Sequence, residues 1–361
     1  MHIGILTGGG DCPGLNAVIR AVTLALRREC NARVTGIERG FLGLLTGRTR
    51  PLDEDSVDGI LAQGGTILGT HNTCDPFHYF GAGGADVSAQ ALDFARSIGL
   101  DAVVAIGGDG TMAIAHKFHH IGLPMVGVPK TIDNDLFHTE RTFGFDSAVA
   151  VVAEALDRLA TTARSHGRVM IAETMGRYAG WIALEGGLAG GANVILIPEL
   201  PYQLERVAAL CRQREERGGA TLICVAEGAR AQGGDMSVRA LLQGSPDPVR
   251  LGGVAQLLAQ QLQPLVQSEV RSVALGHTQR GGTPTAFDRV LAMRFGYHAA
   301  QLVKAGRFGH MVALQSDACT QVPLAEVAGK NRLVPVNDAL LMAARGTGVM
   351  LGGGLGVVLG D

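Results

Sequence analysis

Short apolar runs alternate with longer amphipathic stretches along this sequence, and this alternation constrains the fold more than any other feature. Runs rich in Val, Ile and Leu at residues 2–7, 102–106 and 125–128 each end at a Gly-rich or charged loop. Residues 15–28 instead place their apolar side chains on one face of a helix. Buried parallel strands joined by crossover helices produce this alternation. The pattern therefore predicts an α/β fold.

The length of the chain predicts two lobes. It has 361 residues, and a domain usually takes roughly 150. Further strand-like runs lie at 169–172, 194–197, 222–226 and 273–275, after a long amphipathic stretch at 143–159. Each lobe is expected to hold a mostly parallel sheet flanked by helices. We place the lobes at 1–143, completed by 279–328, and at 144–278, with a C-terminal helix and tail at 329–361.

Composition and charge exclude several classes of protein. Hydrophobic residues make up 47% of the chain and charged residues 18%, and Lys+Arg 31 against Asp+Glu 33 gives a formal charge of −2. These values predict a globular core, with no nucleic-acid partner. No apolar run approaches the 18 or so residues that a membrane span needs, so we expect no membrane partner. The six cysteines form no CxxC pair, which favours a reducing cytoplasm over a zinc ribbon or a disulfide framework.

The loop after the first strand carries three consecutive glycines, Gly8 to Gly10, before a helix. Backbone N–H groups in such a loop can close on an anion, and the N-terminus of the helix favours negative charge. A tight strand-to-helix turn explains the glycines equally well. The string does not match the dinucleotide or P-loop fingerprints.

A second loop, Gly107-Gly108-Asp109-Gly110-Thr111, puts a carboxylate between glycines at a strand end. That position suits a Mg²⁺ ion that bridges phosphate oxygens. Kinases that act on nicotinamide dinucleotides and on lipid alcohols use similar strings. The loop therefore indicates a phosphoryl donor and leaves the acceptor open.

The third loop, Pro129 to Asp135, reads PKTIDND. Phosphoryl transfer needs an electrophilic clamp, a metal and a residue that orients and deprotonates the attacking hydroxyl. Asp133 and Asp135 have a spacing that can divide the last two tasks. In extended backbone they would share a face and repel, which Mg²⁺ or the charge of Lys130 would offset. A helix cap or an Asx turn could explain one of these aspartates, but it does not explain the whole PKTIDND string.

With these motifs in view, the chain resembles the phosphofructokinase family, whose members phosphorylate the 1-hydroxyl of fructose 6-phosphate in glycolysis. The resemblance covers nearly the whole chain. The strings that carry it, in the order of the family, are GGGDCPGLNA, GGDGT, PKTIDND, ETMGRYAGW, VAEGA and LGHTQRGGTP. The resemblance implies that lobe 1–143 binds the phosphoryl donor and lobe 144–278 binds fructose 6-phosphate.

The resemblance also implies roles in catalysis and donor binding. Asp133 is expected to be the general base, with Thr131 beside the reacting hydroxyl and Arg177 steadying the charge on the phosphoryl group. Asp109 and Asp135 are expected to hold Mg²⁺. The expected donor contacts are Gly10, Asn72, Gly108, Asp109, Gly110, Thr111 and Lys130.

The sugar phosphate is expected to contact residues of four other motifs. These are Met175, Gly176 and Arg177, then Glu227, then His277 and Arg280 on the 6-phosphate, besides Thr131 and Asp133. Family members complete this pocket with two arginines from a neighbouring subunit, which correspond to Arg168 and Arg271. Bidentate guanidinium groups suit a doubly charged phosphate. The resemblance therefore implies a homodimer or homotetramer.

Several positions bear on the choice of phosphoryl donor. The resemblance implies ATP from Gly110, because a Gly there leaves room for the α-phosphate of a nucleotide, whereas Lys130 is common among pyrophosphate users. Asn72 stands where many ATP-dependent bacterial members have an Arg. Phe41 either faces an adenine ring or packs under the sheet. We predict an ATP-dependent 6-phosphofructokinase, with a pyrophosphate-dependent enzyme as the alternative.

Two other classes of function fit the sequence less well. A dinucleotide or lipid kinase accounts for GGDGT but leaves MGRYAG and LGHTQRGG without a role. A non-catalytic sugar-phosphate sensor requires a damaged catalytic loop, whereas Asp109, Asp133 and Arg177 are all present. Effector-regulated bacterial members of the family have basic residues just before the VAEGA string. This chain has Glu216 and Gly218 there instead, so we do not expect this protein to be regulated by the same effectors.

Overall fold

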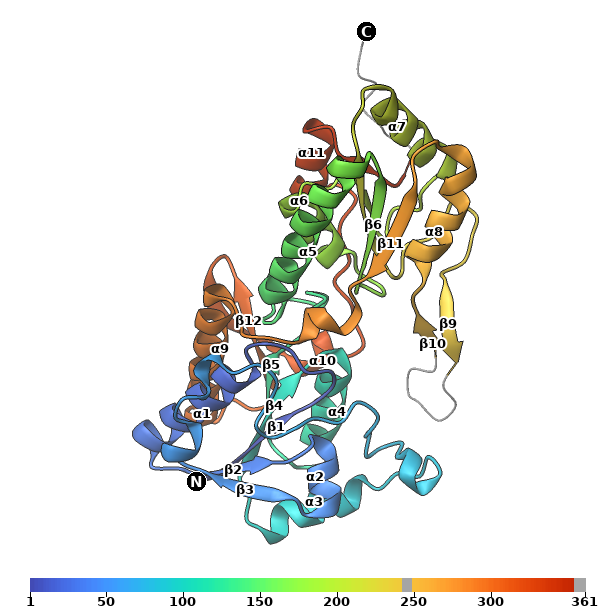
Figure 1. Cartoon of the computed structure of the whole chain (residues 1–361). Helices are drawn as coiled ribbons and strands as arrows, with labels where there is room; N and C mark the ends of the chain where they lie inside the picture. The colour runs from blue at the N-terminus through green and yellow to red at the C-terminus, as the bar shows by residue number, and fades with distance from the viewer. Residues whose placement is uncertain (242–248, 354–361) are drawn as a thin grey trace. The chain divides into compact units, whose positions relative to one another are not determined.

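A computed structural model describes residues 1–241 and 249–353 of the chain (Figure 1). The chain divides into two compact units. Unit 1 contains Met1–Ser147 and Arg280–Arg332, and the described part of unit 2 contains residues 148–241, 249–279 and 333–353.

In the described residues, unit 1 forms a seven-stranded sheet with the order β13-β12-β5-β4-β1-β2-β3. The central strands pair in parallel, while β3 and β13, the edge strands, pair antiparallel with their neighbours. The strands are β1 (His2–Thr7), β2 (Arg33–Ile37), β3 (Thr49–Leu52), β4 (Ala102–Gly107), β5 (Met125–Pro129), β12 (His310–Gln315) and β13 (Ala318–Pro323).

Helices cover both faces of this sheet. In Figure 1, α1 and α9 lie together on one side of β1, β4 and β5, with α4 and α10 on the other. The helices are α1 (Leu15–Cys30), α2 (Phe41–Thr46), α3 (Ser88–Ser97), α4 (Asp109–His120), α9 (Ala286–Lys304) and α10 (Leu324–Val327), with 3₁₀ turns η1 (Asp55–Val57), η2 (Ile60–Ala62) and η3 (Phe80–Ala82). Every residue of β1, β4 and β5 is buried, which explains their continuous apolar runs.

Unit 2, in its described part, contains a five-stranded parallel sheet with the order β11-β6-β8-β7-β14. Its strands are β6 (Val169–Thr174), β7 (Val194–Leu196), β8 (Thr221–Ala226), β11 (Val270–Ala274) and β14 (Met350–Leu351). A separate antiparallel pair consists of β9 (Val238–Leu241) and β10 (Val249–Leu251). The fold class predicted from the sequence is therefore confirmed.

The sheet of unit 2 is also covered by helices on both faces. Figure 1 shows α5 and α6 on one side of β6 and α8 on the other. The helices are α5 (Phe145–His166, which begins in unit 1), α6 (Trp181–Ala189), α7 (Leu204–Glu216), α8 (Val254–Leu262) and α11 (Ala339–Gly346), with 3₁₀ turns η4 (Gln263–Leu265) and η5 (Gly276–Arg280). Buried side chains of α7 and α8 pack on those of β6, β7 and β8 in one core.

The expected strands form at the predicted positions, with shifted ends. Between β8 and α8 the chain forms β9 and β10, and residues 242–248 lie outside the described residues. The C-terminal helix expected within 329–361 is α11, which begins at Ala339. Of the C-terminal tail, residues 354–361 also lie outside the described part.

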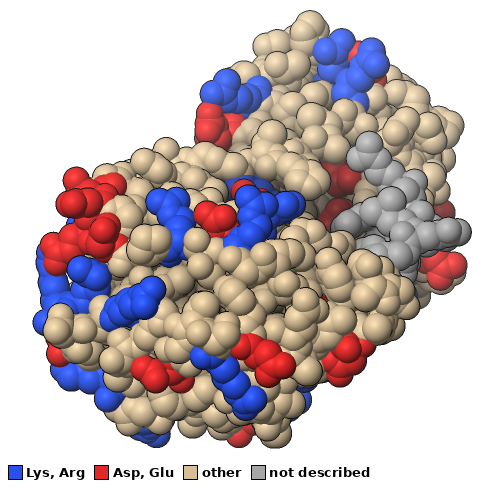
Figure 2. Space-filling view, turned by 90° about the horizontal axis from the view of Figure 1, so that it is seen from below, with Lys and Arg blue, Asp and Glu red and all other residues tan. Residues whose placement is uncertain are grey.

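No helix among the described residues is both long and apolar enough to span a membrane. All six cysteines lie in the described part of the chain and are free. Basic and acidic side chains are interspersed over the face that Figure 2 shows, as the small net charge leads one to expect.

A buried carboxylate, Asp288 near the start of α9, binds the first turn of α5 inside unit 1. Its Oδ2 accepts hydrogen bonds from the backbone N–H of Ser147 at 2.8 Å and from the Ser147 hydroxyl at 2.6 Å. Its Oδ1 is buried without a hydrogen-bond partner. Burial is the main reason that the pKa of Asp288 rises to about 6, with a smaller contribution from the charge of Asp146.

We predict that this carboxyl makes the protein less stable as pH rises from about 4 to about 6. The pKa of Asp288 is higher in the folded state than the value near 3.9 expected for the unfolded chain, so the folded state binds more protons in this range. Its favourable contribution is present below pH 4 and is lost as pH rises through 6. Two pKa units correspond to roughly 2 to 3 kcal/mol. Urea unfolding of the wild type and of Asp288→Asn at several pH values measures this, because the variant lacks the titration. Parallel curves for the two proteins would contradict the assignment.

Candidate active site

Three loops of unit 1 meet because their strands are neighbours. The sheet order β5-β4-β1 with parallel pairing puts the carboxyl ends of these strands at one edge. The loops that follow are the triple-glycine loop, the GGDGT loop and the PKTIDND loop. The backbone N–H of Lys130 donates to Gly107 O at 3.0 Å, which connects the second loop to the third.

Lys130 connects the first loop to the third through its side chain. The ammonium donates a hydrogen bond to the carbonyl oxygen of Gly10. The side chain is buried, with 3% of its surface exposed. Burial, helped by the charge of Arg280, lowers the pKa of Lys130 below its ordinary value. The lysine is therefore a fixed part of this edge rather than a solvated charge.

The TIDND segment forms a tight turn. Asn134 has a φ of 51°, in the left-handed region that Asn tolerates, and its Oδ1 accepts a hydrogen bond from Thr142 N at 3.0 Å. The Thr131 hydroxyl donates to Asp135 Oδ1 at 3.1 Å and accepts from Asp133 N at 3.1 Å. The backbone from Asp133 to Asp135 is therefore not extended, because Asn134 turns the chain between them.

Three carboxylates interact electrostatically at this turn. Burial is the largest cause that raises the pKa of the Asp135 carboxyl to about 7, and the charges of Asp133 and then Asp109 act in the same direction. Asp109 starts α4, where negative charge is favoured. No group of three or more His, Cys, Asp or Glu side chains in residues 1–241 and 249–353 is arranged to hold a metal ion by itself. A cation here would need further ligands from a bound molecule or from water.

The remaining predicted donor residues also lie in unit 1. Gly108 precedes α4, and Thr111 is buried in its first turn. Gly110 is exposed, and a Cβ placed on it would meet no atom within 4 Å. Asn72 is exposed in a loop. Phe41 is buried and stacks on Phe118 with ring centroids 5.6 Å apart, so it packs in the core, the second of its two expected places.

Arg280 also belongs to unit 1. Its Nη1 donates to Asp11 O at 3.3 Å. A Cβ on Gly10 would lie 2.7 Å from the same nitrogen, so the absence of a side chain at Gly10 lets the guanidinium approach the backbone. His277, its expected companion on the 6-phosphate, is exposed in unit 2. Their joint role stays a prediction.

Unit 2 brings the other predicted residues together in the same way. The sheet order β11-β6-β8 places the loops after these three parallel strands at one edge. Met175, Gly176 and Arg177 follow β6, Glu227 follows β8, and His277 follows β11. Glu227 N donates to Thr174 O at 2.9 Å, and Gly228 N to Gly176 O at 3.2 Å. The Arg177 guanidinium lies over the Tyr178 ring, 5.0 Å from its centroid.

Sequence reasoning missed two polar residues of unit 2. Gln279 is fully buried; its Oε1 accepts from Met175 N at 3.2 Å and its Nε2 donates to Gly276 O at 3.0 Å. Glu269 contacts both Arg168 and Arg271. Gln279 lies inside the LGHTQRGG string, so its place in the motif was a usable signal. Nothing local marked Glu269 except its position two residues before an arginine.

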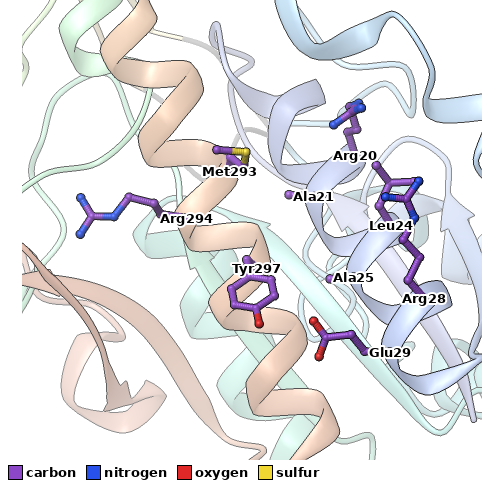
Figure 3. Close-up of a pocket in the computed structure, with 9 residues that line it drawn as sticks. All are labelled: Arg20, Ala21, Leu24, Ala25, Arg28, Glu29, Met293, Arg294 and Tyr297. Carbon is purple, nitrogen blue, oxygen red and sulfur yellow. The ribbon is translucent and has the colours of Figure 1, made fainter.

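A pocket of about 390 Å³ lies elsewhere in unit 1, between α1 and α9 (Figure 3). Apolar side chains such as Leu24, Met293 and Tyr297 form much of its wall, and Arg20 and Arg28 are at its margin. No residue of the three loops lines it. The chemistry-bearing residues are therefore found at strand ends and not in this pocket.

Carboxylates, a buried lysine and Gly-rich backbone at the ends of parallel strands are what the transfer of a phosphoryl group requires, and the class of protein they define is an α/β phosphotransferase. A family model described as "Phosphofructokinase" matches residues 2–303. The chain belongs to the phosphofructokinase family.

Relatives of two kinds are similar to this chain over most of its length. A "Pyrophosphate--fructose 6-phosphate 1-phosphotransferase" from Amycolatopsis methanolica is 50% identical, over 93% of this chain and 96% of the relative. An "ATP-dependent 6-phosphofructokinase" from Chloroflexus aurantiacus is 48% identical, over 97% of this chain and 98% of the relative. The two names differ in the phosphoryl donor.

Solved structures agree on the fold. A pyrophosphate-dependent phosphofructokinase from Marinobacter aquaeolei matches with a TM-score of 0.80 at 22% identity, over 93% of this chain and 86% of that one. The phosphofructokinase of Pichia pastoris matches with a TM-score of 0.76 at 32% identity. The match covers 90% of this chain and 35% of the Pichia chain, so this chain spans about a third of that relative's length.

Proposed function

We propose that this protein is an ATP-dependent 6-phosphofructokinase, which transfers the γ-phosphate of ATP to the 1-hydroxyl of fructose 6-phosphate. The products are fructose 1,6-bisphosphate and ADP. The observation that carries the proposal is the edge of unit 1 where Asp133, Asp135 and Asp109 interact beside Thr131 and the buried Lys130. Family membership supports the reaction class, and the relatives' names support the sugar phosphate as acceptor.

Asp133 is the proposed general base. As the 1-oxygen of the sugar attacks the γ-phosphorus, the Asp133 carboxylate takes the hydroxyl proton. The bond between the γ-phosphorus and the bridging oxygen breaks, and its electron pair leaves with ADP. Thr131 fixes the backbone N–H of Asp133 at 3.1 Å and so helps to aim the carboxylate. Arg177 is proposed to stabilise the charge on the phosphoryl group.

Asp109 and Asp135 are proposed to hold Mg²⁺. They fit such an ion, because their oxygens are hard ligands and because their mutual repulsion with Asp133 is offset by a cation. Two carboxylates, phosphate oxygens and water form a usual Mg²⁺ environment. When bound, the ion would neutralise charge on the oxygens of the donor phosphates.

Unit 2 is proposed to bind the sugar phosphate. Arg177, Met175 and Gly176 would contact the sugar and its reacting end, and Glu227 would accept a hydrogen bond from a hydroxyl. His277, together with Arg280 of unit 1, would hold the 6-phosphate. Support comes from the shared edge of β6, β8 and β11 and from the buried Gln279, which fixes Met175 N.

ATP is favoured as donor by the open space at Gly110. A nucleotide is larger than pyrophosphate and needs open space of this kind beside the loop. Gly108, Thr111 and Asn72 complete the proposed donor contacts. Pyrophosphate is the second candidate, because Lys130 is buried against Gly10 and supplies a cation in the donor loop. The relatives carry both names.

Self-association to a homodimer or homotetramer is proposed from the edge strand of unit 2. In β11 only Val270 is buried, and the next four residues, Arg271 to Ala274, are exposed. An exposed edge strand of this kind can pack against a second copy of the chain. Arg271 lies in this edge strand and Arg168 directly precedes the neighbouring strand β6, and we propose that both reach the sugar phosphate of that neighbouring copy.

With matched Mg²⁺, the purified protein should phosphorylate fructose 6-phosphate with ATP at least ten times more efficiently than with pyrophosphate. A coupled assay of kcat/KM with each donor measures the ratio. A preference of ten-fold or more for pyrophosphate would select the second candidate, and no turnover with either donor would refute the phosphofructokinase proposal.

Asp133→Ala should lower kcat by ~10²- to 10⁴-fold, the usual effect of removing a general base. The affinity for fructose 6-phosphate should change little, since the proposed phosphate contacts lie in unit 2 and on Arg280. Asp157→Ala, which removes an exposed carboxylate of α5, serves as the control and should keep wild-type kinetics. Near-normal turnover by Asp133→Ala would refute the assignment.

Arg271→Ala should raise the KM for fructose 6-phosphate and leave the KM for the donor unchanged. If Arg271 serves a neighbouring subunit, mixed oligomers of Arg271→Ala and Asp133→Ala contain some complete sites and should recover part of the activity. Activity of mixtures refolded together, compared with that of each variant alone, tests this. Verified mixed oligomers with no recovery would contradict sharing.

A further inference from the structure

A single carboxylate bridges the two arginines that are proposed to reach a neighbouring sugar phosphate. Glu269 Oε2 lies 2.5 Å from Nε of Arg168, and its Oε1 accepts a hydrogen bond from Nη2 of Arg271. All three residues belong to unit 2. The charges of Arg168 and Arg271 hold the pKa of the Glu269 carboxyl below its ordinary value, although loss of surrounding water opposes that shift.

Strand register creates this arrangement. The parallel pairing of β11 with β6 puts Val270 beside Val169, which places Glu269 beside Arg168 one residue earlier. A hydrogen bond from Val169 N to Glu269 O, 3.1 Å long, continues the pairing to that point. Glu269 and Arg271 are two residues apart along the strand and so share one face. The sheet therefore fixes the backbone of all three residues.

The ion pairs of Glu269 with Arg168 and Arg271 contribute little to the stability of the fold. The side chains of Arg168, Glu269 and Arg271 are 27%, 39% and 61% exposed, and ion pairs this exposed contribute little to the free energy of folding. The shared carboxylate has a larger effect on the side-chain conformations of the two arginines. Without the carboxylate between them, the two guanidinium groups would repel and sample many rotamers, whereas a shared carboxylate offsets the repulsion and restricts the rotamers.

The two ion pairs also leave N–H groups of both arginines available to donate further hydrogen bonds. Each guanidinium has five N–H groups in a planar fork. Glu269 contacts Arg168 through Nε and Arg271 through Nη2, so each fork retains further N–H groups. A phosphate dianion is matched by two such forks, and forks already held in place lose less freedom on binding.

We propose that Glu269 is a positioning residue that holds Arg168 and Arg271 as one clamp for a phosphate dianion. This inference rests on the proposed function, in which the dianion is the 6-phosphate of the sugar bound to a second copy. Glu269 acts through the two arginines and does not itself contact the substrate. A carboxylate that merely competed with the phosphate would have the opposite effect on affinity.

Glu269→Gln tests the inference, because the amide keeps the size of the side chain but has one acceptor oxygen and no charge. The KM for fructose 6-phosphate should rise about ten-fold, while kcat and the donor KM stay within two-fold of wild type. The urea unfolding midpoint should not change. In an Arg271→Ala background, the same substitution should alter the KM less than two-fold, because the clamp is already broken.

Glu154→Gln is the matched control, since Glu154 is an exposed carboxylate on α5 that pairs with Arg158 at 2.5 Å. It should keep wild-type kinetics. An unchanged or lowered KM in Glu269→Gln would overturn the inference, as would an equal effect in the presence and absence of Arg271. Wild-type turnover of fructose 6-phosphate is measured first. Its absence refutes the proposed function, whereas normal wild-type turnover with an unaffected Glu269→Gln refutes only the role of Glu269.

Discussion

Parallel pairing of β5, β4 and β1 is the constraint on which the chemistry of unit 1 depends. Parallel strands run in one direction, so their three following loops have to emerge at one edge of the sheet. Each strand is buried along its whole length, which leaves little freedom for any of them to slide. Residues as distant in sequence as Gly10, Asp109 and Asp135 are therefore brought to one edge by the packing of apolar side chains that have no chemical role.

Charge balance is the second requirement at that edge. A buried ammonium and a group of carboxylates are each costly when alone. Lys130 is stabilised by the Gly10 carbonyl and by the charges of Asp11 and Asp109, which raise its pKa against the larger effect of burial. Asp135 is disfavoured as an anion by burial and by its acidic neighbours. At Asp135 the repulsion from Asp133 and Asp109 adds to the cost of burial, and a bound cation would offset that repulsion.

In unit 1 the sequence predicted β1, β4 and β5, because parallel strands covered on both faces leave continuous Val, Ile and Leu runs. It did not predict β2, β3, β12 or β13. These strands lie at or next to the sheet edges, and β3 contains Pro51, which a central strand would not tolerate. The turn at Asn134 was also missed, because it depends on a hydrogen bond to Thr142, eight residues away. Contacts such as Lys130 to Gly10, 120 residues apart, arise from sheet order and leave no local pattern. Motif residues were found, but their partners Gln279 and Glu269 were not.

The edge strand β11 shows how one set of charges can meet two needs. An exposed strand edge invites pairing with any available strand, and charged side chains are a common way to prevent this. Arg271 and Glu269 on one face of the strand, with Arg168 beside them, provide such charges. Two arginines without Glu269 would repel cationic surfaces but would attract anions of any shape. Joined through Glu269, the trio carries a net single positive charge with its forks already aligned, so a dianion with tetrahedral oxygens is favoured over a diffuse acidic surface. The Glu269 carboxylate therefore lowers the net charge of this strand edge and can at the same time increase its selectivity for a phosphate dianion.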